Sequence, residues 1–390
     1  MEPGFLTSEF DYPLSNDRIA VTPAVPRDHS QLLVLTASGR VGDFGEKFEI
    51  QKRKFFEIAD FFNPGDLVVI NNAKVLPVRL RGFRVDEKTR SKAGAVEAVL
   101  LTPETLAPEA ESCVWNAFLH LSAKLRPGLK FIFEPGLHAE CLSTSEERLQ
   151  NQGEIRLKFE MSYAKMVEWL GQHGSVPLPH YIEENQTPNQ AKDREQFLTQ
   201  YQTVFASKIG SAAAPTAGFH FTPELMGRLQ AKGVSFAELT LHVGIGTFRP
   251  IKTKTLSEHF MHEETFEVSP ELREKILETK KRQGRVVAVG TTVTRSLESW
   301  YSLTQGSLDP GTFKTNLFIN PGFRFQMIDD LITNFHLPQS TLLVLVSAAM
   351  GNRDDPKVGI ARMKEAYAFA MDNGFRFYSF GDAMLLRGKN

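Results

Sequence analysis

Hydrophobic and polar positions divide this chain into stretches of two kinds. From residue 66 to about residue 160, short runs of apolar and β-branched residues recur at regular spacing, and turn signals such as Pro127-Gly128 and Pro135-Gly136 separate them. The runs are Leu67–Ile70, Val78–Val85, Ala95–Leu101, Val114–Leu119, Leu129–Phe133, Leu137–Leu142 and Ile155–Phe159. This spacing predicts the strands of a small antiparallel β-barrel or sandwich.

After residue 160 the pattern alternates between helical and strand-like segments. We expect helices near residues 162–172, 223–232, 270–283, 294–304 and 357–373, and strands near residues 235–243, 286–290, 315–319, 341–347 and 376–379. Alternation of this kind predicts a layered α/β domain. The expected fold is an α/β (α+β) main domain formed by both ends of the chain, residues 1–65 and 160–390, with an inserted small antiparallel β-barrel domain at residues 66–159.

The charge of the chain is balanced, with 45 basic and 46 acidic side chains among 390 residues. No global basic field attracts nucleic acid, so RNA binding requires a local patch. The two cysteines, Cys113 and Cys141, fit a reducing compartment. The first residues lack a signal-peptide pattern, and the longest apolar run, Leu342–Met350, is too short to span a bilayer. We therefore expect a cytoplasmic protein that does not enter a membrane.

One run of small residues stands out as a candidate ligand loop. Residues 210–222 read GSAAAPTAGFHFT and include Pro215, Thr216, Gly218 and His220. Such residues let a backbone approach a ligand closely. Thr222 and Pro223 then open a helix, whose N-terminus favours an anionic or electron-rich group. The alternative is a tight turn packed under that helix.

A second candidate lies where the apolar run 286–289 ends at Gly290, followed by Thr291 and Thr292. In open α/β sheets, ligands bind where strands end and helices begin. Arg295 is suited to a carboxylate or phosphate, which it can bind through two parallel hydrogen bonds. The alternative is that the hydroxyl residues only cap the helix.

Two further segments carry candidate ligand contacts. Residues 241–248, LHVGIGTF, are a strand that breaks into a turn at Gly244, Gly246 and Thr247. The turn lacks the third glycine of a dinucleotide fingerprint, so a β-bulge and a ligand contact are both open. Asn334 and His336 lie in the loop NFHLP, which either only connects two elements or binds a ligand.

Two clusters raise the questions of RNA and metal binding. The densest cationic cluster comprises Lys280, Lys281, Arg282 and Arg285. It lies at an expected helix end, where cations offset the dipole, and contact with an RNA backbone is the alternative. His259 and His262 would share a helix face, with His242 as a third ligand, but no HExxH pattern is present. We expect no metal site.

Together these runs resemble one family over nearly the full length, the S-adenosylmethionine:tRNA ribosyltransferase-isomerase family of queuosine biosynthesis. The matching segments are Pro26-Arg27-Asp28, GDLVVINNAKVLPVRLRG (65–82), PLPHYI (177–182), YQTVFA (201–206), GSAAAPTAGFHFT (210–222), LHVGIGTF (241–248), MHEE (261–264), VAVGTTVTRSLE (287–298), LFINPGF (317–323), TNFHLPQSTLLVLVSAAMG (333–351) and RFYSFGDAMLL (376–386). These motifs are specific to the family rather than to a widespread fold.

The resemblance implies a reaction in which the ribosyl part of S-adenosylmethionine moves to 7-aminomethyl-7-deazaguanine at the wobble position of tRNA. The product is epoxyqueuosine, and adenine and methionine are released. S-adenosylmethionine is then a substrate, and no cofactor or metal is implied. The expected partners are S-adenosylmethionine and tRNA carrying 7-aminomethyl-7-deazaguanine, and we expect a monomer.

The chemistry requires a base near the 5′ carbon beside the sulfonium and an acid or donor for departing adenine. The candidate catalytic residues are His220, His242, His262, Glu263 and His336, with Glu264 beside them. The candidate substrate-binding residues are Pro215, Thr216, Gly218, Gly244, Gly246, Thr247, Gly290, Thr291, Thr292, Arg295 and Asn334. Our leading hypothesis is His220 as acid or base, with Thr216 and Gly218 lining the donor.

The chain departs from the family pattern at three places. Where the family usually has Asn-Asp-Thr-Arg, this chain reads Asn71-Asn72-Ala73-Lys74. Val25 replaces a usual Glu, and Gln339 replaces a usual Lys. Since Lys does not replace Arg in bidentate binding, a catalytically weakened relative that binds tRNA or a nucleotide is the alternative function. A metal-dependent hydrolase is a distant third.

Overall fold

The computed structural model describes residues 4–86, 88–89, 91–104, 110–121, 124–151, 153–177, 197–242, 250–352 and 354–389. The chain forms two compact units. The first comprises Met1–Ala73, Gln202–Lys208 and Ala214–Asn390, and the second comprises Lys74–Tyr201 and Ile209–Ala213. A mixed α/β unit built from both ends of the chain and a unit holding a closed barrel confirm the predicted fold class.

The first unit is built on a nine-stranded sheet of order β15-β13-β12-β3-β14-β16-β17-β1-β2. In chain order its strands are β1 (Gln31–Arg40), β2 (Asp43–Lys54), β3 (Leu67–Asn71), β12 (Ser235–Leu241), β13 (Glu264–Val268), β14 (Val286–Val289), β15 (Gly311–Thr315), β16 (Asp330–Asn334) and β17 (Ala383–Lys389). The central strands β12, β3, β14 and β16 run parallel, and β17 runs antiparallel to β16. The carboxyl ends of the parallel strands and the start of β17 therefore meet at one edge of the sheet.

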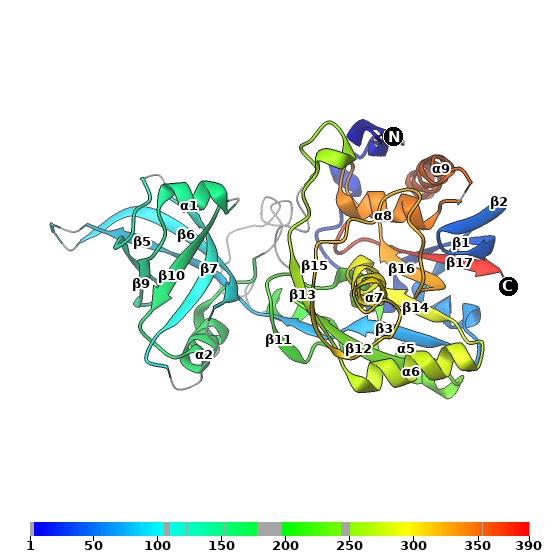
Figure 1. Cartoon of the computed structure of the whole chain (residues 1–390), viewed down its shortest axis with the longest axis horizontal. Helices are drawn as coiled ribbons and strands as arrows, with labels where there is room; N and C mark the ends of the chain where they lie inside the picture. Colours follow the sequence, from blue (N-terminus) through cyan, green and yellow to red (C-terminus); the bar gives the residue numbers. More distant parts are fainter. Residues whose placement is uncertain are drawn as a thin grey trace. The chain divides into compact units, whose positions relative to one another are not determined.

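Helices cover this sheet. They are α5 (Pro223–Ala231), α6 (Pro270–Lys281), α7 (Thr291–Leu303), α8 (Thr341–Ala349) and α9 (Val358–Asp372). Both α6 and α7 pack against β3, and in the view of Figure 1 this strand lies between them. All five residues of β3 are buried, as expected for a parallel strand covered on both faces. The prediction that residues 67–70 belong to the β-rich insert is therefore wrong.

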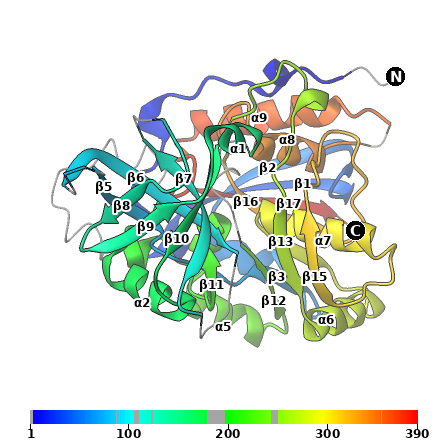
Figure 2. The ribbon, with the colours of Figure 1, turned by 60° about the vertical axis from the view of Figure 1, so that its left-hand side comes forward.

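The second unit contains a closed six-stranded antiparallel barrel of order β10-β7-β6-β5-β8-β9 (Figure 2). Its strands are β5 (Arg79–Val85), β6 (Lys92–Pro103), β7 (Cys113–His120), β8 (Lys130–Phe133), β9 (Leu137–Cys141) and β10 (Glu154–Phe159). Buried and partly exposed residues alternate along β7, which is the pattern of a strand with one face toward the barrel core. The described residues also form two helices, α1 (Ser145–Gln150) and α2 (Tyr163–His173), and the paired strands β4 (Ala73–Val75) and β11 (Lys208–Ser211). We keep an inserted barrel domain as a proposal, with its start moved from residue 66 past β3 and its end moved from residue 159 past α2.

Three of the predicted strands are wrong. Residues 341–349 form helix α8, whose N-cap Ser340 accepts a hydrogen bond from the Leu343 amide at 3.2 Å. A short run that is apolar on every side has no period that separates a buried strand from a buried helix. The strand expected near 315–319 lies earlier, as β15, and the one near 376–379 lies later, as β17.

No helix among the described residues is both long enough and apolar enough to cross a membrane.

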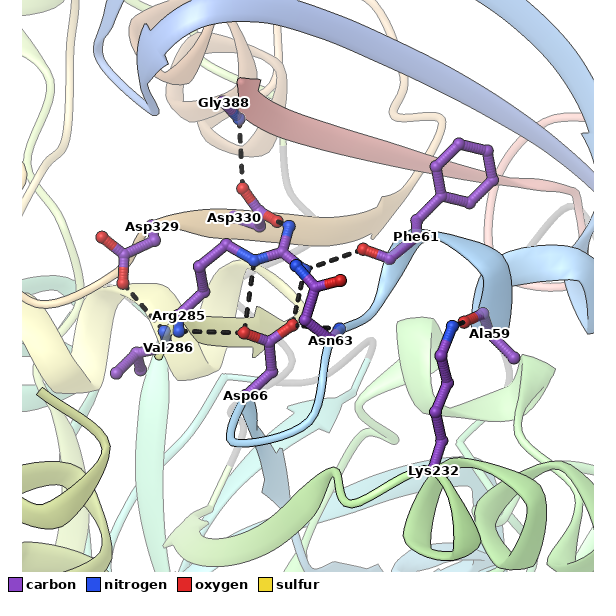
Figure 3. A network of polar contacts seen from close by, with 10 residues as sticks. All are labelled: Ala59, Phe61, Asn63, Asp66, Lys232, Arg285, Val286, Asp329, Asp330 and Gly388. Atoms are coloured by element: carbon purple, nitrogen blue, oxygen red, sulfur yellow. Dashed lines mark hydrogen bonds and ion pairs between the residues drawn. The ribbon is translucent and has the colours of Figure 1, made fainter. Parts of the chain in front are cut away.

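A buried ionic network lies at the amino-terminal ends of β3, β14 and β16 (Figure 3). The Arg285 guanidinium contacts Asp66 Oδ2 at 2.5 Å and Asp330 Oδ2 at 2.7 Å, and it donates to the Phe61 carbonyl at 2.7 Å. Asp330 accepts a further hydrogen bond from the Gly388 amide at 3.1 Å. Arg285 is 7% exposed, so it is a structural residue and not part of a solvated cationic cluster.

Candidate active site

A cavity opens at the carboxyl ends of β14 and β16, beside the start of α7. Its lining residues are Ala214, Pro215, Thr216, Ala217, Gly290, Thr291, Thr292, Thr333, Asn334, Phe335, His336, Leu342, Tyr378 and Ser379. This is the edge at which open α/β sheets bind ligands. The cavity brings together seven of the predicted residues: Pro215, Thr216, Gly290, Thr291, Thr292, Asn334 and His336.

The wall formed by α7 presents backbone donors. Gly290, the N-cap, has φ of +96°, a conformation that favours glycine, and no side chain caps the helix. The first-turn residues Thr291 and Thr292 are buried, at 6% and 7% exposure. A buried helix N-terminus with uncapped amides is an electropositive site. The alternative that Thr291 and Thr292 serve only to cap α7 has no support in its hydrogen bonds.

A second polar group of the lining is the side chain of Asn334, at the end of β16. Its Nδ2 lies 3.3 Å from the carbonyl of Tyr378 and 3.2 Å from Nε2 of His220, and its Oδ1 accepts from the Thr216 hydroxyl at 3.2 Å. Because a carbonyl only accepts, Nδ2 must face Tyr378, and this fixes the orientation of the amide. The same Nδ2 therefore donates to Nε2 of His220.

This orientation determines the tautomer of His220. Since Nε2 accepts, the ring proton lies on Nδ1, which is 2.8 Å from the Ser30 hydroxyl and donates to it. Burial, aided by the positive charges of Arg376 and Arg27, lowers the pKa of His220 to about 3, so the ring is neutral at pH 7. Both ring nitrogens are engaged within the protein, and His220 lies behind Asn334 rather than on the cavity wall.

His336 does line the cavity. Its Nε2 lies 2.9 Å from the hydroxyl of Thr333, while Nδ1 makes no hydrogen bond with a described residue. Its backbone is held on both sides, because the amide donates to the Tyr367 hydroxyl at 3.0 Å and the carbonyl accepts from the Tyr12 hydroxyl. Burial lowers the pKa of His336 to about 3, so its ring is also neutral at pH 7.

Arg295 lies outside the cavity lining, contrary to the expectation that it receives a ligand anion. It is 3% exposed, its Nη1 lies 2.5 Å from Oε2 of Glu264, and its Nε donates to the Leu317 carbonyl at 3.0 Å. Glu264, considered for proton transfer, is thus the partner of a buried cation. The pairing of these two charges was not visible in the sequence because they come from different elements, β13 and α7.

The other candidate residues are dispersed. Glu263 is exposed and paired with Lys314 at 2.7 Å, and His262 is half-buried outside the cavity lining. A Cβ on Gly218 would lie 2.5 Å from the ring of Phe205, so this glycine serves packing within its turn. No cluster of three or more metal-ligating side chains occurs within the described part of the chain.

His242 lies at the end of β12, next to the segment 243–249. Burial lowers its pKa, and its Nδ1 is buried without a partner among the described residues. Gly244, Gly246 and Thr247 lie outside the residues that the structure describes. Their contact with substrate remains a prediction.

The departures from the family pattern make contacts within the protein. Asn72 donates from Nδ2 to Glu238 at 2.8 Å and accepts from the Thr240 hydroxyl at 2.8 Å. An aspartate there would face the carboxylate of Glu238, so asparagine suits this neighbour. Gln339 donates to Asp11 at 3.0 Å, as a lysine would. Neither Asn72 nor Gln339 belongs to the cavity lining.

The sequence interpretation missed four residues of the site. Thr333, Tyr378 and Ser379 line the cavity, and Ser30 holds His220. The segment RFYSFGDAMLL, already noted as part of the family resemblance, contained a signal for Tyr378 and Ser379. Tyr378 has φ of +73°, which is uncommon for a residue with a side chain and typical of strained positions at ligand sites.

A cavity lined by backbone donors and a fixed amide, at the carboxyl ends of parallel strands, is the arrangement typical of α/β proteins that bind a small polar ligand. The model of the family described as queuosine biosynthesis protein matches residues 7–386. The chain belongs to this family.

Relatives match along almost their whole length. The S-adenosylmethionine:tRNA ribosyltransferase-isomerase of Thermotoga petrophila is 42% identical over 97% of this chain and 99% of its own. The protein of the same name from Rhodospirillum rubrum is 40% identical over 97% of this chain and 96% of its own. A crystal structure of an S-adenosylmethionine tRNA ribosyltransferase from Thermotoga maritima has 32% identity and a TM-score of 0.49, with 97% of this chain and 100% of that chain covered.

Proposed function

We propose that this chain transfers the ribosyl part of S-adenosylmethionine to 7-aminomethyl-7-deazaguanine at the wobble position of tRNA and isomerises it, forming epoxyqueuosine. Adenine and methionine leave. The observation that carries the proposal is identity of 40–42% to ribosyltransferase-isomerases over 97% of the chain. The cavity at the carboxyl ends of the strands is lined by seven of the predicted catalytic and substrate-binding residues, and it is the proposed binding site for S-adenosylmethionine.

His336 is the proposed proton acceptor at the 5′ carbon. It lies on the cavity wall and is neutral at pH 7, because burial lowers its pKa to about 3. In the tautomer that donates from Nε2 to Thr333, the lone pair of Nδ1 is available as a base. The sulfonium makes the carbon beside it more acidic, which reduces the basicity that this step requires.

His220 has a different proposed role from the acid or base first expected. Its ring nitrogens bind Ser30 and Asn334, so it has no free position for a substrate proton. It acts as a positioning residue that holds the Asn334 amide. The second lone pair of Asn334 Oδ1 then accepts a hydrogen bond from the substrate.

The decisive experiment incubates the purified chain with S-adenosylmethionine and tRNA that carries 7-aminomethyl-7-deazaguanine. We expect adenine and methionine to appear in equal amounts with epoxyqueuosine in the digested tRNA. Unmodified tRNA with guanine at the wobble position is the control. Tight tRNA binding without adenine release would identify the alternative, a catalytically weakened relative.

We propose that the chain acts in the cytoplasm as a monomer, without a cofactor or a metal. Sedimentation of the chain alone and with tRNA measures its oligomeric state, and a dimer would contradict the monomer. Unchanged turnover after dialysis against a chelator is the expected result for metal removal.

A further inference from the structure

The N-terminus of α7 carries more hydrogen-bond donors than the protein satisfies. The amides of Thr291, Thr292 and Val293 have no acceptor among the described residues, and all three residues are buried. Buried amides without partners are costly, and proteins rarely leave them so. Helices α5, α6 and α8 have a side-chain cap, from Thr222, Ser269 and Ser340, whereas α9, like α7, has none.

Ser379 provides a second, independent donor at the same place. Its residue is 2% exposed, it lines the cavity together with Thr291 and Thr292, and its Oγ has no partner among the described residues. The loop that carries it is fixed, because the Tyr378 amide donates to the Phe335 carbonyl at 3.0 Å and the Gly381 amide donates to the Tyr378 carbonyl at 3.0 Å. The Ser379 hydroxyl and the N-terminus of α7 are therefore fixed groups that line the same cavity.

The charge of the expected ligand group follows from the helix. No acidic residue lies in the first turn of α7, so the positive end of its dipole is not offset there. Arg295, the cation on α7, is paired with Glu264 and does not line the cavity. An anion with several acceptor atoms satisfies amides and hydroxyl together. Of the parts of S-adenosylmethionine, only the methionine carboxylate is anionic.

We propose, on the basis of the proposed function, that the first-turn amides of α7 and the Ser379 hydroxyl bind the carboxylate of the methionine part of S-adenosylmethionine. Asn334 Oδ1 and the Thr216 hydroxyl, whose residues also line the cavity, accept hydrogen bonds from the donor groups of the same substrate.

The test compares S-adenosylmethionine with its decarboxylated analogue by calorimetry. Ser379→Ala should weaken binding of S-adenosylmethionine about tenfold or more, because a hydrogen bond to a charged acceptor is lost. Binding of the decarboxylated analogue should change less than about twofold. Ser347→Ala is the matched control, because it removes an equally buried hydroxyl that bonds within α8 to Val344.

A second pair of variants isolates a backbone donor. Thr291→Pro removes the first amide of α7 at a position where proline is compatible with a helix, and Thr291→Ala keeps that amide. We expect Thr291→Pro to weaken S-adenosylmethionine binding several-fold more than Thr291→Ala, and to spare the decarboxylated analogue. This pair carries the test if Ser379→Ala does not fold.

The outcomes separate this site assignment from the proposed function. Equal losses for both ligands, or no loss for S-adenosylmethionine, overturn the carboxylate site, even if adenine release from tRNA assays is intact. If the variants lose affinity for S-adenosylmethionine but not for the decarboxylated analogue, the carboxylate site is supported. If the unmodified chain then releases no adenine in the tRNA assay, the proposed reaction is wrong although the site stands. If tRNA affinity falls in Ser379→Ala instead, the anion bound there is a phosphate, and the assignment is wrong.

Discussion

Polar groups are buried at both ends of the central parallel strands, but their hydrogen bonds differ. At the amino ends, Arg285 is surrounded by Asp66, Asp330 and the Phe61 carbonyl (Figure 3). At the carboxyl ends, the amides that begin α7 and the hydroxyl of Ser379 have no partner among the described residues. A satisfied buried network holds a fold together, whereas unsatisfied donors around a cavity are suited to a ligand.

The largest expected effect comes from breaking the satisfied network. Asp66→Ala leaves the buried Arg285 short of its principal partner, and loss of one member of a buried ion pair costs about 3–5 kcal/mol. Urea unfolding measures this change in the free energy of unfolding. The control is Glu271→Ala, which removes one partner of the exposed ion pair with Lys275 and should leave the urea midpoint unchanged. The fraction that remains folded should bind S-adenosylmethionine normally. A small loss of stability would show that water replaces the partner.

The next largest effect is expected at His220. His220→Ala frees the Asn334 amide, and misplacement of a substrate-positioning group by about 1 Å costs about 100-fold in turnover. His220→Gln should restore much of this rate, because its amide oxygen can accept from Asn334 where Nε2 does. The shape of the pH–rate profile should be the same in His220→Gln and the unmodified chain. No recovery by glutamine would favour direct proton transfer by His220.

The pH dependence of stability is a smaller effect. Burial lowers the pKa values of His220 and His336 from 6.5 to about 3, so between these values only the unfolded chain binds their protons. Stability therefore falls as the pH decreases from 6.5 toward 3. Urea unfolding at pH 7 and pH 4.5 should show a smaller fall in His220→Gln, which lacks one of these groups.

Asp330, at the other end of the strands, titrates in the opposite sense. Burial raises its pKa from 3.8 to about 6, against the attraction of Arg285. The folded chain therefore binds the proton of Asp330 more tightly than the unfolded chain does. The contribution of this proton to the free energy of unfolding is fully present below pH 3.8 and is lost as the pH rises through 6. If stability falls between pH 7 and pH 4.5 as much in His220→Gln as in the unmodified chain, the assignment of that fall to His220 is wrong.

The smallest effect is expected at Glu263. It is exposed and paired with Lys314 outside the cavity, so Glu263→Gln should leave turnover within about twofold of the unmodified chain. His336→Gln is the informative comparison in the same assay, because that side chain lines the cavity. A strong loss in Glu263→Gln would show that the acid acts on tRNA or substrate.

Much of the site was readable from local sequence. Gly290 with Thr291 ends an apolar strand, and Pro215 with Thr216 lies in a run too small in side chains to fill a core. Such signals are local, because a strand end, a helix start or a close backbone approach needs particular residue types within a few positions. The barrel strands were predicted for the same reason, since alternation and turns are short-range patterns.

Other features were decided by tertiary structure. The apolar run at Thr341–Ala349 became a helix because burial on every side removes the periodicity that distinguishes the two structures. Arg295 looks free in the sequence, but Glu264 lies 31 positions away and neutralises it. His220 looked reactive until its two nitrogens were found bound to Ser30 and Asn334.

The sequence by itself determined the family, the strands of the barrel and the small-residue loops that line the cavity, because those depend on neighbours along the chain. Only the tertiary structure decided which polar groups are satisfied. The partners of Arg285, Arg295 and His220 come from distant elements, and the unpartnered state of Ser379 is a property of its surroundings. A hydrogen bond depends on distance and direction in space, which a linear pattern of residues does not contain.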